Sequence, residues 1–414
     1  MTKNKLYEIM APVGSYESLS AAIQGGADAV YFGTEGLNMR SRSSANFTTG
    51  DLHKIARICK KNQLKSYLTV NTIIYDNDLE QMRQVIDEAK KAKISAIIAT
   101  DVAAMIYARS IGMEVHLSTQ LNISNVEALA FYAQFADVVV LARELNLDQV
   151  AAIHGQIHER QIKGPSGQLV RIEMFCHGAL CMAVSGKCYL SLHEMDASAN
   201  RGACNQVCRR EYLVKDKDSE IELAIENQYI MSPKDLKTIH FIPKLIDAGV
   251  TVFKIEGRAR GPEYVRTVCE CYREAIDSCC DGTFSEEKIA EWDVRLQSVF
   301  NRGFWNGYYL GQRLGEWSHR YGNAATEQKL YVGKALNYFS RLQVAEFLME
   351  THSLSKGDKV LITGPTTGAL FLNVEEMRVD LNPVERTEKG ERFSMKVPEK
   401  VRPSDKLFKI LSTP

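Results

Sequence analysis

The sequence lacks the apolar segments that place a protein in a membrane. No apolar run approaches the ~20 residues of a transmembrane helix, and the stretch from Met1 to Gly14 has no apolar core of the ~7–15 residues found in a signal peptide. An excess of either charge is also missing, because 51 Lys and Arg residues balance 51 Asp and Glu residues. Zero net charge excludes a protein that coats nucleic acid or an acidic membrane through a general positive field, although it leaves a local basic face open. We therefore expect a cytoplasmic protein with no membrane partner.

The composition also excludes intrinsic disorder. Of the 414 residues, 45% are hydrophobic and 25% are charged, which is close to the globular average. At roughly 100–200 residues per domain, this length predicts one large core with an appendage, or two to three domains.

Short runs of β-branched and apolar residues alternate with longer amphipathic stretches over residues 1–260. The stretches between the runs, such as Ser15–Gly25 and Asp78–Lys91, have the three- and four-residue apolar spacing of helices. Eight strands alternating with helices predict an α/β fold of the (β/α)8 TIM-barrel type. The main alternative, a doubly wound open sheet, lacks its usual Gly-x-Gly-x-x-Gly turn after the first strand, where Ser15 is instead expected to cap the first helix. The predicted strands are Tyr7–Pro12, Ala29–Gly33, Lys65–Asn71, Ala96–Asp101, Glu114–Thr119, Asp137–Arg143, Ile172–His177 and Thr251–Glu256.

Three further parts complete the predicted domain organisation. An insertion over residues 178–250 interrupts the barrel, and such folds build their sites from insertions at the carboxyl ends of the strands. Within it, Glu211–Val214 and Ile221–Ile230 are typical of a hairpin. A helical extension follows over residues 261–325. Short alternating strands punctuated by Gly, Pro and Asp then predict a small all-β barrel domain over residues 327–414.

Four of the ten cysteines fall in the insertion with the spacing Cys-x6-Cys-x15-Cys-x3-Cys. In a reducing compartment they are not naturally a disulfide framework, and four thiolates from one loop can bind zinc or a 4Fe-4S cluster. Zinc ribbons usually have close cysteine pairs at both ends, so the wide first pair favours the cluster, with zinc as the alternative occupant. The alternative without a metal, four small core residues, fits poorly with an otherwise polar loop. The predicted ligands are Cys181, Cys188, Cys204 and Cys208.

The other six cysteines are expected to be structural. Cys176 falls on a strand, which makes it a poorer ligand candidate. Four thiols spread along one helix cannot all face one metal, and Cys59 stands alone. The helical four are Cys269, Cys271, Cys279 and Cys280.

Two segments around the cysteines form a specific signature: EMFCHGALC from Glu173 to Cys181, and SGKCYLS from Ser185 to Ser191. They resemble the peptidase U32 family, historically labelled collagenase-like peptidases. HLSTQ at His116–Gln120, FKIEGR at Phe253–Arg258 and FNRGF at Phe300–Phe304 extend the resemblance to nearly the whole chain.

The resemblance implies a function that the residues alone do not. Better understood U32 members resemble iron–sulfur proteins that hydroxylate without oxygen, taking the hydroxyl from prephenate. The type with an appended small barrel resembles the one that makes 5-hydroxyuridine at the tRNA wobble position. A 4Fe-4S cluster on the four matching cysteines, prephenate as co-substrate and tRNA as partner are therefore expected, together with a homo-oligomer or a hetero-oligomer with a related U32 chain. The one departure is Cys176, where Val is commoner in the family.

Such a hydroxylase needs a cationic clamp for a small aromatic dicarboxylate and a group for proton transfer. Arg143 and Arg258 suit bidentate carboxylate recognition, although each also has a structural interpretation as a salt bridge with a neighbouring Glu. Arg40 and Arg42 follow the second strand and could reach the same face, although their ordinary interpretation is a solvated loop. The candidates for substrate binding are Asn71, Gln120, Asn122, Arg143, Lys254 and Arg258, and those for proton transfer are His177 and Glu256.

A U32 peptidase acting on collagen-like substrates is the first alternative function. The sequence has no His-Glu-x-x-His pair and no Gly-x-Ser-x-Gly turn. Cysteines that could pair with His177 or His116 are those that the cluster would consume. A non-catalytic, metal-stabilised RNA-binding module is the third hypothesis.

Overall fold

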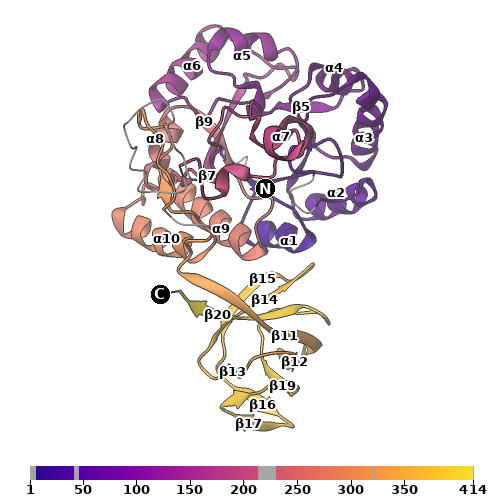
Figure 1. Cartoon of the computed structure of the whole chain (residues 1–414), viewed down its shortest axis with the longest axis vertical. Coiled ribbons are helices and arrows are strands. Elements are labelled where there is room, and N and C mark those ends of the chain that lie inside the picture. The colour runs from indigo at the N-terminus through magenta and orange to yellow at the C-terminus, as the bar shows by residue number, and fades with distance from the viewer. Residues whose placement is uncertain (1–5, 42–45, 213–229, 320–321, 414) are drawn as a thin grey trace.

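Eight parallel strands close into a barrel in the computed structural model, which describes residues 6–41, 46–212, 230–319 and 322–413 (Figure 1). The barrel strands are β1 (Glu8–Pro12), β2 (Ala29–Phe32), β3 (Lys65–Val70), β4 (Ala96–Ala99), β5 (Glu114–Leu117), β6 (Val138–Val140), β7 (Arg171–Gly178) and β9 (Val250–Ile255). Neighbours from β1 to β7 pair in parallel, and β9 closes the ring by pairing with both β7 and β1. The predicted (β/α)8 barrel is confirmed.

Helices surround the barrel and begin at the expected capping residues. The Ser15 hydroxyl accepts a hydrogen bond from the Ser18 amide, which confirms the predicted cap, and Asn125 and Asn146 cap two later helices in the same way. The first helix after β9 packs against α1 and β1, so it takes the place of the eighth barrel helix within the stretch predicted as a helical extension. The helices are α1 (Tyr16–Gln24), α2 (Leu52–Lys61), α3 (Leu79–Ala92), α4 (Val102–Ser110), α5 (Val126–Tyr132), α6 (Leu147–Glu159), α8 (Ile242–Asp247), α9 (Pro262–Cys280) and α10 (Glu286–Ser298).

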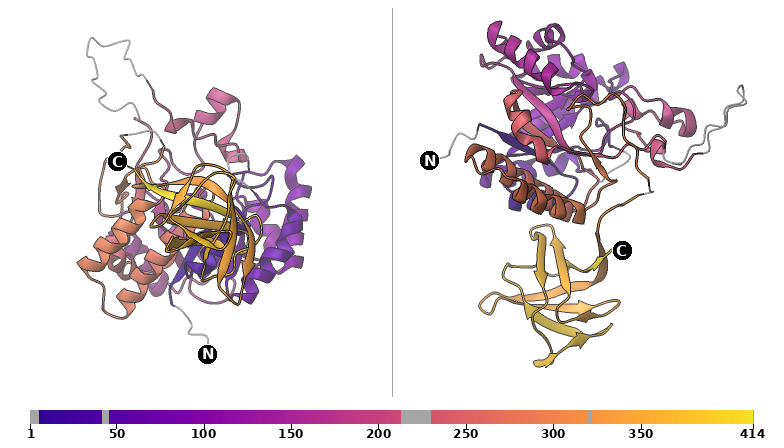
Figure 2. Two further views of the ribbon diagram at one scale, coloured as in Figure 1. Left: turned by 90° about the horizontal axis from the view of Figure 1, so that it is seen from below. Right: turned by 90° about the vertical axis from the view of Figure 1, so that its left-hand side faces the viewer.

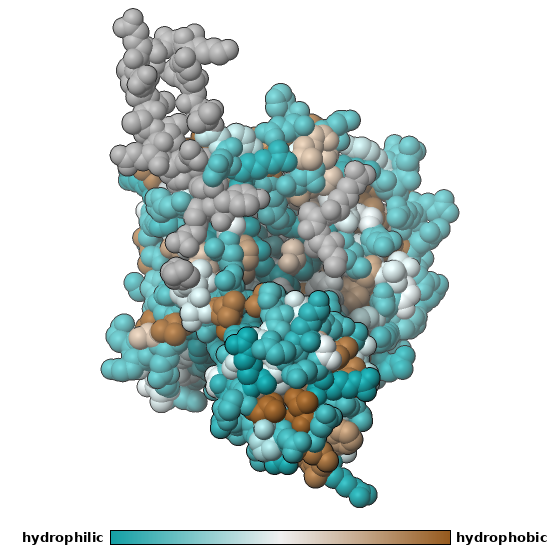
Figure 3. Space-filling model, turned by 60° about the horizontal axis from the view of Figure 1, so that its bottom comes forward, coloured by the Kyte–Doolittle hydropathy of each residue, from teal (hydrophilic) through white to brown (hydrophobic). Residues whose placement is uncertain are grey.

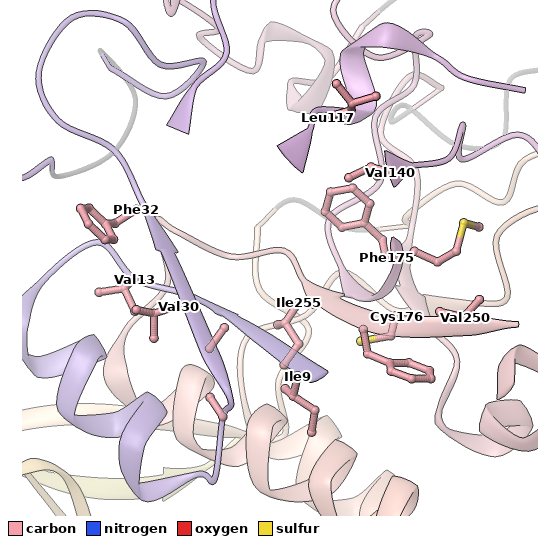
Figure 4. Close-up of a cluster of buried hydrophobic side chains, with 14 of the residues drawn as sticks. Ile9, Val13, Val30, Phe32, Leu117, Val140, Phe175, Cys176, Val250 and Ile255 are labelled. Carbon is pink, nitrogen blue, oxygen red and sulfur yellow. The ribbon is translucent and has the colours of Figure 1, made fainter. Parts of the chain in front are cut away.

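Side chains alternate between two environments along the barrel strands. Outward-facing residues such as Ile9, Val30 and Ile255 join the main hydrophobic core between the strands and the helices (Figure 4). Inward-facing residues form a separate small cluster in the barrel that includes Met10 and Val252. Charged side chains occupy inward positions at the amino ends of alternate strands, namely Glu8, Lys65, Glu114 and Arg171.

The insertion lies between β7 and β9. It contains α7 (Leu190–Met195) and several 3-10 turns, and it returns through β8 (Asp235–Lys237), which pairs antiparallel to β7 and parallel to β10 (Phe304–Trp305). Figure 2 shows α7 projecting from the barrel. Residues of the insertion line one cavity with residues that follow β3, β5, β6 and β9, so the insertion covers the carboxyl ends of the strands. The hairpin predicted from Glu211–Val214 and Ile221–Ile230 falls largely on residues 213–229, which lie outside the described residues.

An antiparallel sheet forms the C-terminal domain, which confirms the prediction of an all-β domain. The sheet order is β15-β14-β20-β11-β12-β19-β16-β17, around a core of its own that includes Phe347 and Phe393. Its strands are β11 (Glu327–Phe339), β12 (Val344–Met349), β14 (Lys359–Gly364), β15 (Gly368–Asn373), β16 (Met377–Val379), β17 (Asn382–Val384), β19 (Arg392–Lys396) and β20 (Lys406–Ser412), and the short β13 (Leu354–Ser355) and β18 (Arg386–Thr387) pair separately.

The C-terminal domain docks on α1 and α9 of the barrel. The Gln24 side chain donates to the Thr367 carbonyl (2.9 Å) and accepts from the Ala369 amide (3.1 Å), while Leu361 and Ala369 join the main hydrophobic core. The surface shown in Figure 3 is mostly hydrophilic, with small, separate groups of hydrophobic residues. Among the described ranges, no helix is long and apolar enough to cross a membrane.

Candidate functional site at the carboxyl end of the barrel

A cavity of about 170 Å³, partly open to solvent, lies at the carboxyl ends of the barrel strands beneath the insertion. This end of the fold is where (β/α)8 enzymes build their active sites. Most of the residues predicted from the sequence line it, although they come from the carboxyl ends of four strands and from the insertion. They are Asn71, Gln120, Arg143, Lys254, Glu256, Arg258, Cys181, Cys204 and Cys208.

Positive charge dominates the wall of the cavity. Its described lining contains five basic side chains, Arg40, Arg143, Arg209, Lys254 and Arg258, against the single carboxylate of Glu256. The field inside such a cleft attracts anions strongly, because the low-dielectric wall screens charge less than water does.

Glu256 is held as a carboxylate. The Tyr31 hydroxyl donates to its Oε2 (3.1 Å), and Arg40 Nη2 lies 3.6 Å from its Oε1. Burial by itself raises the pKa of Glu256, but Arg40, Arg143 and Arg258 lower it by more, so the net shift is downward. Glu256 is therefore suited to accept a hydrogen bond or a proton rather than to act as a resting acid.

The two predicted clamp residues are fixed by different partners. Arg258 donates to Thr69 Oγ1 (2.8 Å) and Asn38 Oδ1 (2.5 Å), and burial lowers its pKa to about 10. Arg143 donates to the Ala179 carbonyl (3.2 Å), and its guanidinium carbon lies 3.8 Å from the centre of the Phe175 ring. Arg143 Nε is buried and has no hydrogen-bond partner, so this guanidinium keeps a donor for a ligand.

Three of the four predicted ligand cysteines face the cavity, and Cys188 lies on the outer side of the insertion, where it lines a separate surface depression. All four thiols are free of disulfides. Burial and the negative charges that Cys181, Cys204 and Cys188 would carry together raise the pKa of Cys208 to about 11, against the lowering effect of Arg209. The four thiols therefore lie within electrostatic reach of one another. No group of three or more His, Cys, Asp or Glu residues in the described ranges surrounds a single metal position.

Neighbouring barrel loops hold the insertion in place. The Ile73 amide donates to the Asn200 carbonyl (3.1 Å), and Arg201 pairs with Asp78 while its guanidinium lies 4.1 Å from the centre of the Tyr75 ring. Gly202 has a φ of 85°, and a Cβ at this position would lie 2.5 Å from the Asn38 carbonyl oxygen.

Besides Cys188, two of the predicted residues do not line the cavity. Asn122 donates to the Ser185 carbonyl (3.0 Å), so it supports the insertion from below. His177 is buried away from the cavity, against Tyr264, Tyr272 and Phe304. Burial lowers its pKa to about 3, which keeps the imidazole neutral.

A strand irregularity explains the position of His177. By simple alternation it would face inward like Phe175, two residues earlier. The register between β7 and β9 shifts here, so that Phe175 pairs with the inward-facing Lys254 and His177 with the outward-facing Ile255. The single extra residue turns the imidazole towards α9.

The interpretation of Arg40 as part of a solvated loop is wrong. Its side chain, 25% exposed, lines the cavity beside Glu256. Burial lowers its pKa, but the negative potential of Glu256, Cys204 and Cys181 raises it by more. Asn38, which donates to the Thr34 carbonyl (2.5 Å) and accepts from the Arg40 amide (3.0 Å), folds the loop inward. Asn38, a turn-forming residue two positions before Arg40, was the signal in the sequence for a loop that folds inward. Arg42 lies outside the described residues.

The remaining cysteines lie away from the cavity. Cys59, Cys176, Cys269 and Cys271 are buried, Cys279 is half-buried and Cys280 is exposed at the end of α9. Burial raises the pKa of Cys269 and Cys271, in the latter case to about 12, as expected for thiols packed in a core.

Comparison with known proteins finds a family model, described as peptidase family U32, that matches residues 14–319. A Porphyromonas gingivalis protein named collagenase is 70% identical over 97% of both chains. The tRNA hydroxylation protein P1 of Bacillus subtilis is 33% identical, with 86% of this chain and 83% of that protein covered. A 23S rRNA 5-hydroxycytidine synthase of Escherichia coli is 35% identical over 75% of this chain and 46% of that protein.

Proposed function

This chain belongs to peptidase family U32, and we propose that it is an iron–sulfur-dependent enzyme that hydroxylates the wobble uridine of tRNA without oxygen, taking the hydroxyl from prephenate. The observation that carries the proposal is a single cavity that combines five basic side chains with three free cysteines. The names of the relatives that act on tRNA and 23S rRNA support an RNA substrate.

The cysteines fit an iron–sulfur cluster by the chemistry of the donor set. Four free thiols from one loop lie within electrostatic reach of one another, and three of them face the cavity. A four-iron cluster binds each thiolate through a different iron atom, so it suits separated thiols better than one tetrahedral zinc ion does. Cys181, Cys188, Cys204 and Cys208 would hold the cluster, and Arg209 and Arg40 would offset its negative charge.

A dicarboxylate is the small molecule that the cavity suits best. Arg143 and Arg40 both line the cavity and both lie within the electrostatic field of Glu256. Arg258 is already committed to Thr69 and Asn38, so it contributes charge more than direct contact. A bound cluster would supply Lewis-acid and redox chemistry, while the arginines orient the hydroxyl donor next to it.

Glu256 and two amides are placed to bind the uracil ring. A uracil presents one N–H donor and two carbonyl acceptors, and the ionised Glu256 carboxylate is a strong acceptor for the N–H group. The side-chain amides of Asn71 and Gln120, which line the same cavity, provide donors for the carbonyls. With the ring turned so that carbon 5 faces it, the Glu256 carboxylate would instead accept the proton that leaves carbon 5 on hydroxylation.

A peptidase is the second candidate, because the relative named collagenase is 70% identical over nearly the whole chain. The cavity geometry gives it less support. The described lining includes three cysteines but no histidine that could activate them, since His177 faces α9 and His116 lies inside the barrel.

A reconstituted assay separates the two candidates. Protein purified without oxygen is incubated with unmodified tRNA, with and without prephenate, and in parallel with gelatin. We expect a brown protein and 5-hydroxyuridine that depends on prephenate and not on oxygen. A colourless protein that contains one zinc ion and cleaves gelatin would overturn the proposal in favour of the peptidase.

A further inference from the structure

A column of titratable side chains runs through the barrel from the cavity to the opposite end. Lys254 lines the cavity, and Glu114 stands at the amino end of β5 with its side chain 44% exposed. Between them, Glu173 on β7 and His116 on β5 are completely buried. The interior of a (β/α)8 barrel is normally filled with apolar residues, so a charged column there requires a reason.

Neighbouring residues of this column are within hydrogen-bond distance at both ends, but the two residues in the middle are not. Lys254 Nζ lies 2.7 Å from Glu173 Oε1, and His116 Nε2 lies 3.2 Å from Glu114 Oε1. Glu173 Oε2 and His116 Nδ1 face each other at 3.9 Å, and each is buried without a hydrogen-bond partner. Two orphaned polar atoms at this separation come within hydrogen-bond distance of each other when either side chain shifts by about 1 Å, and a proton shared between them would satisfy both.

Surrounding groups hold the column in position but do not hydrogen-bond to Glu173 Oε2 or His116 Nδ1. The Tyr67 ring packs on the His116 ring with 4.4 Å between centres, and the Tyr67 hydroxyl donates to Glu8 Oε1 (2.7 Å). Lys65 and Arg171 pair with the other oxygen of Glu8, so this second network has one more cation than anion, and both cations also act on the nearby Glu114 carboxylate. At the cavity end, the Tyr31 and Phe175 rings lie 4.9 Å and 5.4 Å from Lys254 Nζ.

We propose that Lys254, Glu173, His116 and Glu114 conduct protons between the cavity and solvent at the amino end of the barrel. In the outward direction the Lys254 ammonium gives a proton to Glu173, whose carboxyl passes it directly to His116 Nδ1 when the 3.9 Å gap closes. The imidazole releases its Nε2 proton to Glu114, which gives it to solvent. Only N–H and O–H bonds break and form, and no group is oxidised or reduced.

The geometry explains why such a route is useful. A macromolecular substrate over the mouth of the cavity would cut off solvent on that side, and the reaction would then need another way to exchange protons. Because any proton-releasing reaction in this cavity has that need, the proposal goes beyond the identity of the substrate and does not depend on the hydroxylase assignment.

Exchange of the His116 ring N–H protons with water tests the conduit without an activity assay. The full chain is labelled with 15N-histidine, the signal is assigned with His116→Gln, and exchange is measured by NMR saturation transfer from water. We expect rapid exchange despite complete burial. Glu114→Gln blocks proton transfer from His116 towards the amino end of the barrel, and Glu173→Gln blocks transfer towards the cavity. Each variant alone should slow exchange partly, and the two substitutions together should slow it at least tenfold.

The control is Glu127→Gln, which removes an exposed acid paired with Arg160 outside the barrel and should leave the rate unchanged. Thermal melts confirm that each variant is folded. If exchange of the His116 ring protons takes hours in the unaltered protein, the proposed proton route is wrong, even if the combined variant fails to fold. An equal rate in the unaltered and combined variants would overturn it as well.

Discussion

At the scale of single residues, the cavity works by placing one carboxylate among several guanidinium groups. Glu256 is ionised because Arg40, Arg143 and Arg258 outweigh the effect of burial on its pKa. In return the carboxylate partly neutralises the arginines, which keeps them from repelling one another before a ligand arrives. A dianionic ligand can then enter a site that is already organised, and less of its binding energy is lost in rearranging side chains.

Replacing Arg143 should weaken ligand binding more than folding. In Arg143→Lys the charge remains but the forked pair of donors is lost, so we expect the KM for prephenate to rise about tenfold, in line with ~1.5 kcal/mol for a hydrogen bond to a charged group. Steady-state kinetics of tRNA hydroxylation measure the change. Arg160→Lys, at an exposed pair with Glu127, is the matched control and should leave KM unchanged. Equal KM values in both variants would remove Arg143 from the clamp.

Cys208 tests the metal site at the same scale. Cys208→Ser removes one predicted ligand, and we expect anaerobically purified protein to lose its visible iron–sulfur absorption and most of its iron. Cys280→Ser changes an exposed thiol at the end of α9 and should keep both. Iron content and the visible spectrum provide the measurement, and unchanged iron in Cys208→Ser would contradict the ligand assignment.

Several of these residues could be predicted because their chemistry is local. The spacing of the four cysteines and the polar residues at strand ends are visible in the sequence, and the closed barrel brings them to one cavity. His177 and Arg40 could not be placed in this way. One depends on a register shift between β7 and β9, and the other on a loop folded inward by Asn38, and both are properties of tertiary packing.

At the scale of elements, the insertion depends on contacts with the barrel loops more than on a core of its own. Ile73 and Asp78 on one loop and Ser41 on another hold the short turn that contains Arg201 and Gly202. Cys204 follows directly after this turn, so the position of the thiol depends on these contacts.

Gly202→Ala should therefore disturb the cysteine loop while sparing the barrel. The added Cβ would meet the Asn38 carbonyl oxygen at 2.5 Å in a left-handed backbone conformation, which costs about 1–3 kcal/mol of local strain. We expect lower iron content and faster amide exchange over residues 199–209, with barrel amides unchanged. Gly155→Ala, on α6 with open space around the Cβ position, is the control. Identical exchange in the two variants would show that the turn does not position Cys204.

At the scale of the whole molecule, the barrel carries charge inside as well as at its mouth. Alternate strands place Glu8, Lys65, Glu114 and Arg171 at inward positions of the amino end. The pattern is visible in the sequence as polar residues two apart within apolar strands, but the direction of each side chain follows only from the closed register.

Glu8 gives this arrangement a pH dependence. Burial raises its pKa, but Lys65, Tyr67 and Arg171 lower it by more, so the folded-state pKa lies below the ordinary value of a glutamate. The stabilisation is thus fully present above the unfolded-state pKa and is lost as the pH falls through the folded-state value. Urea unfolding between pH 7 and pH 3 should show a smaller loss of stability in Glu8→Gln than in the unaltered protein. Parallel curves would contradict the assignment.

The hydroxylase account as a whole is tested most directly in a strain that lacks this protein. Mass spectrometry of its tRNA nucleosides should show loss of 5-hydroxyuridine and of the nucleosides derived from it. The unaltered chain should restore them, and Cys208→Ser should not. If these nucleosides are unchanged in a strain with no parallel pathway, the central claim is wrong.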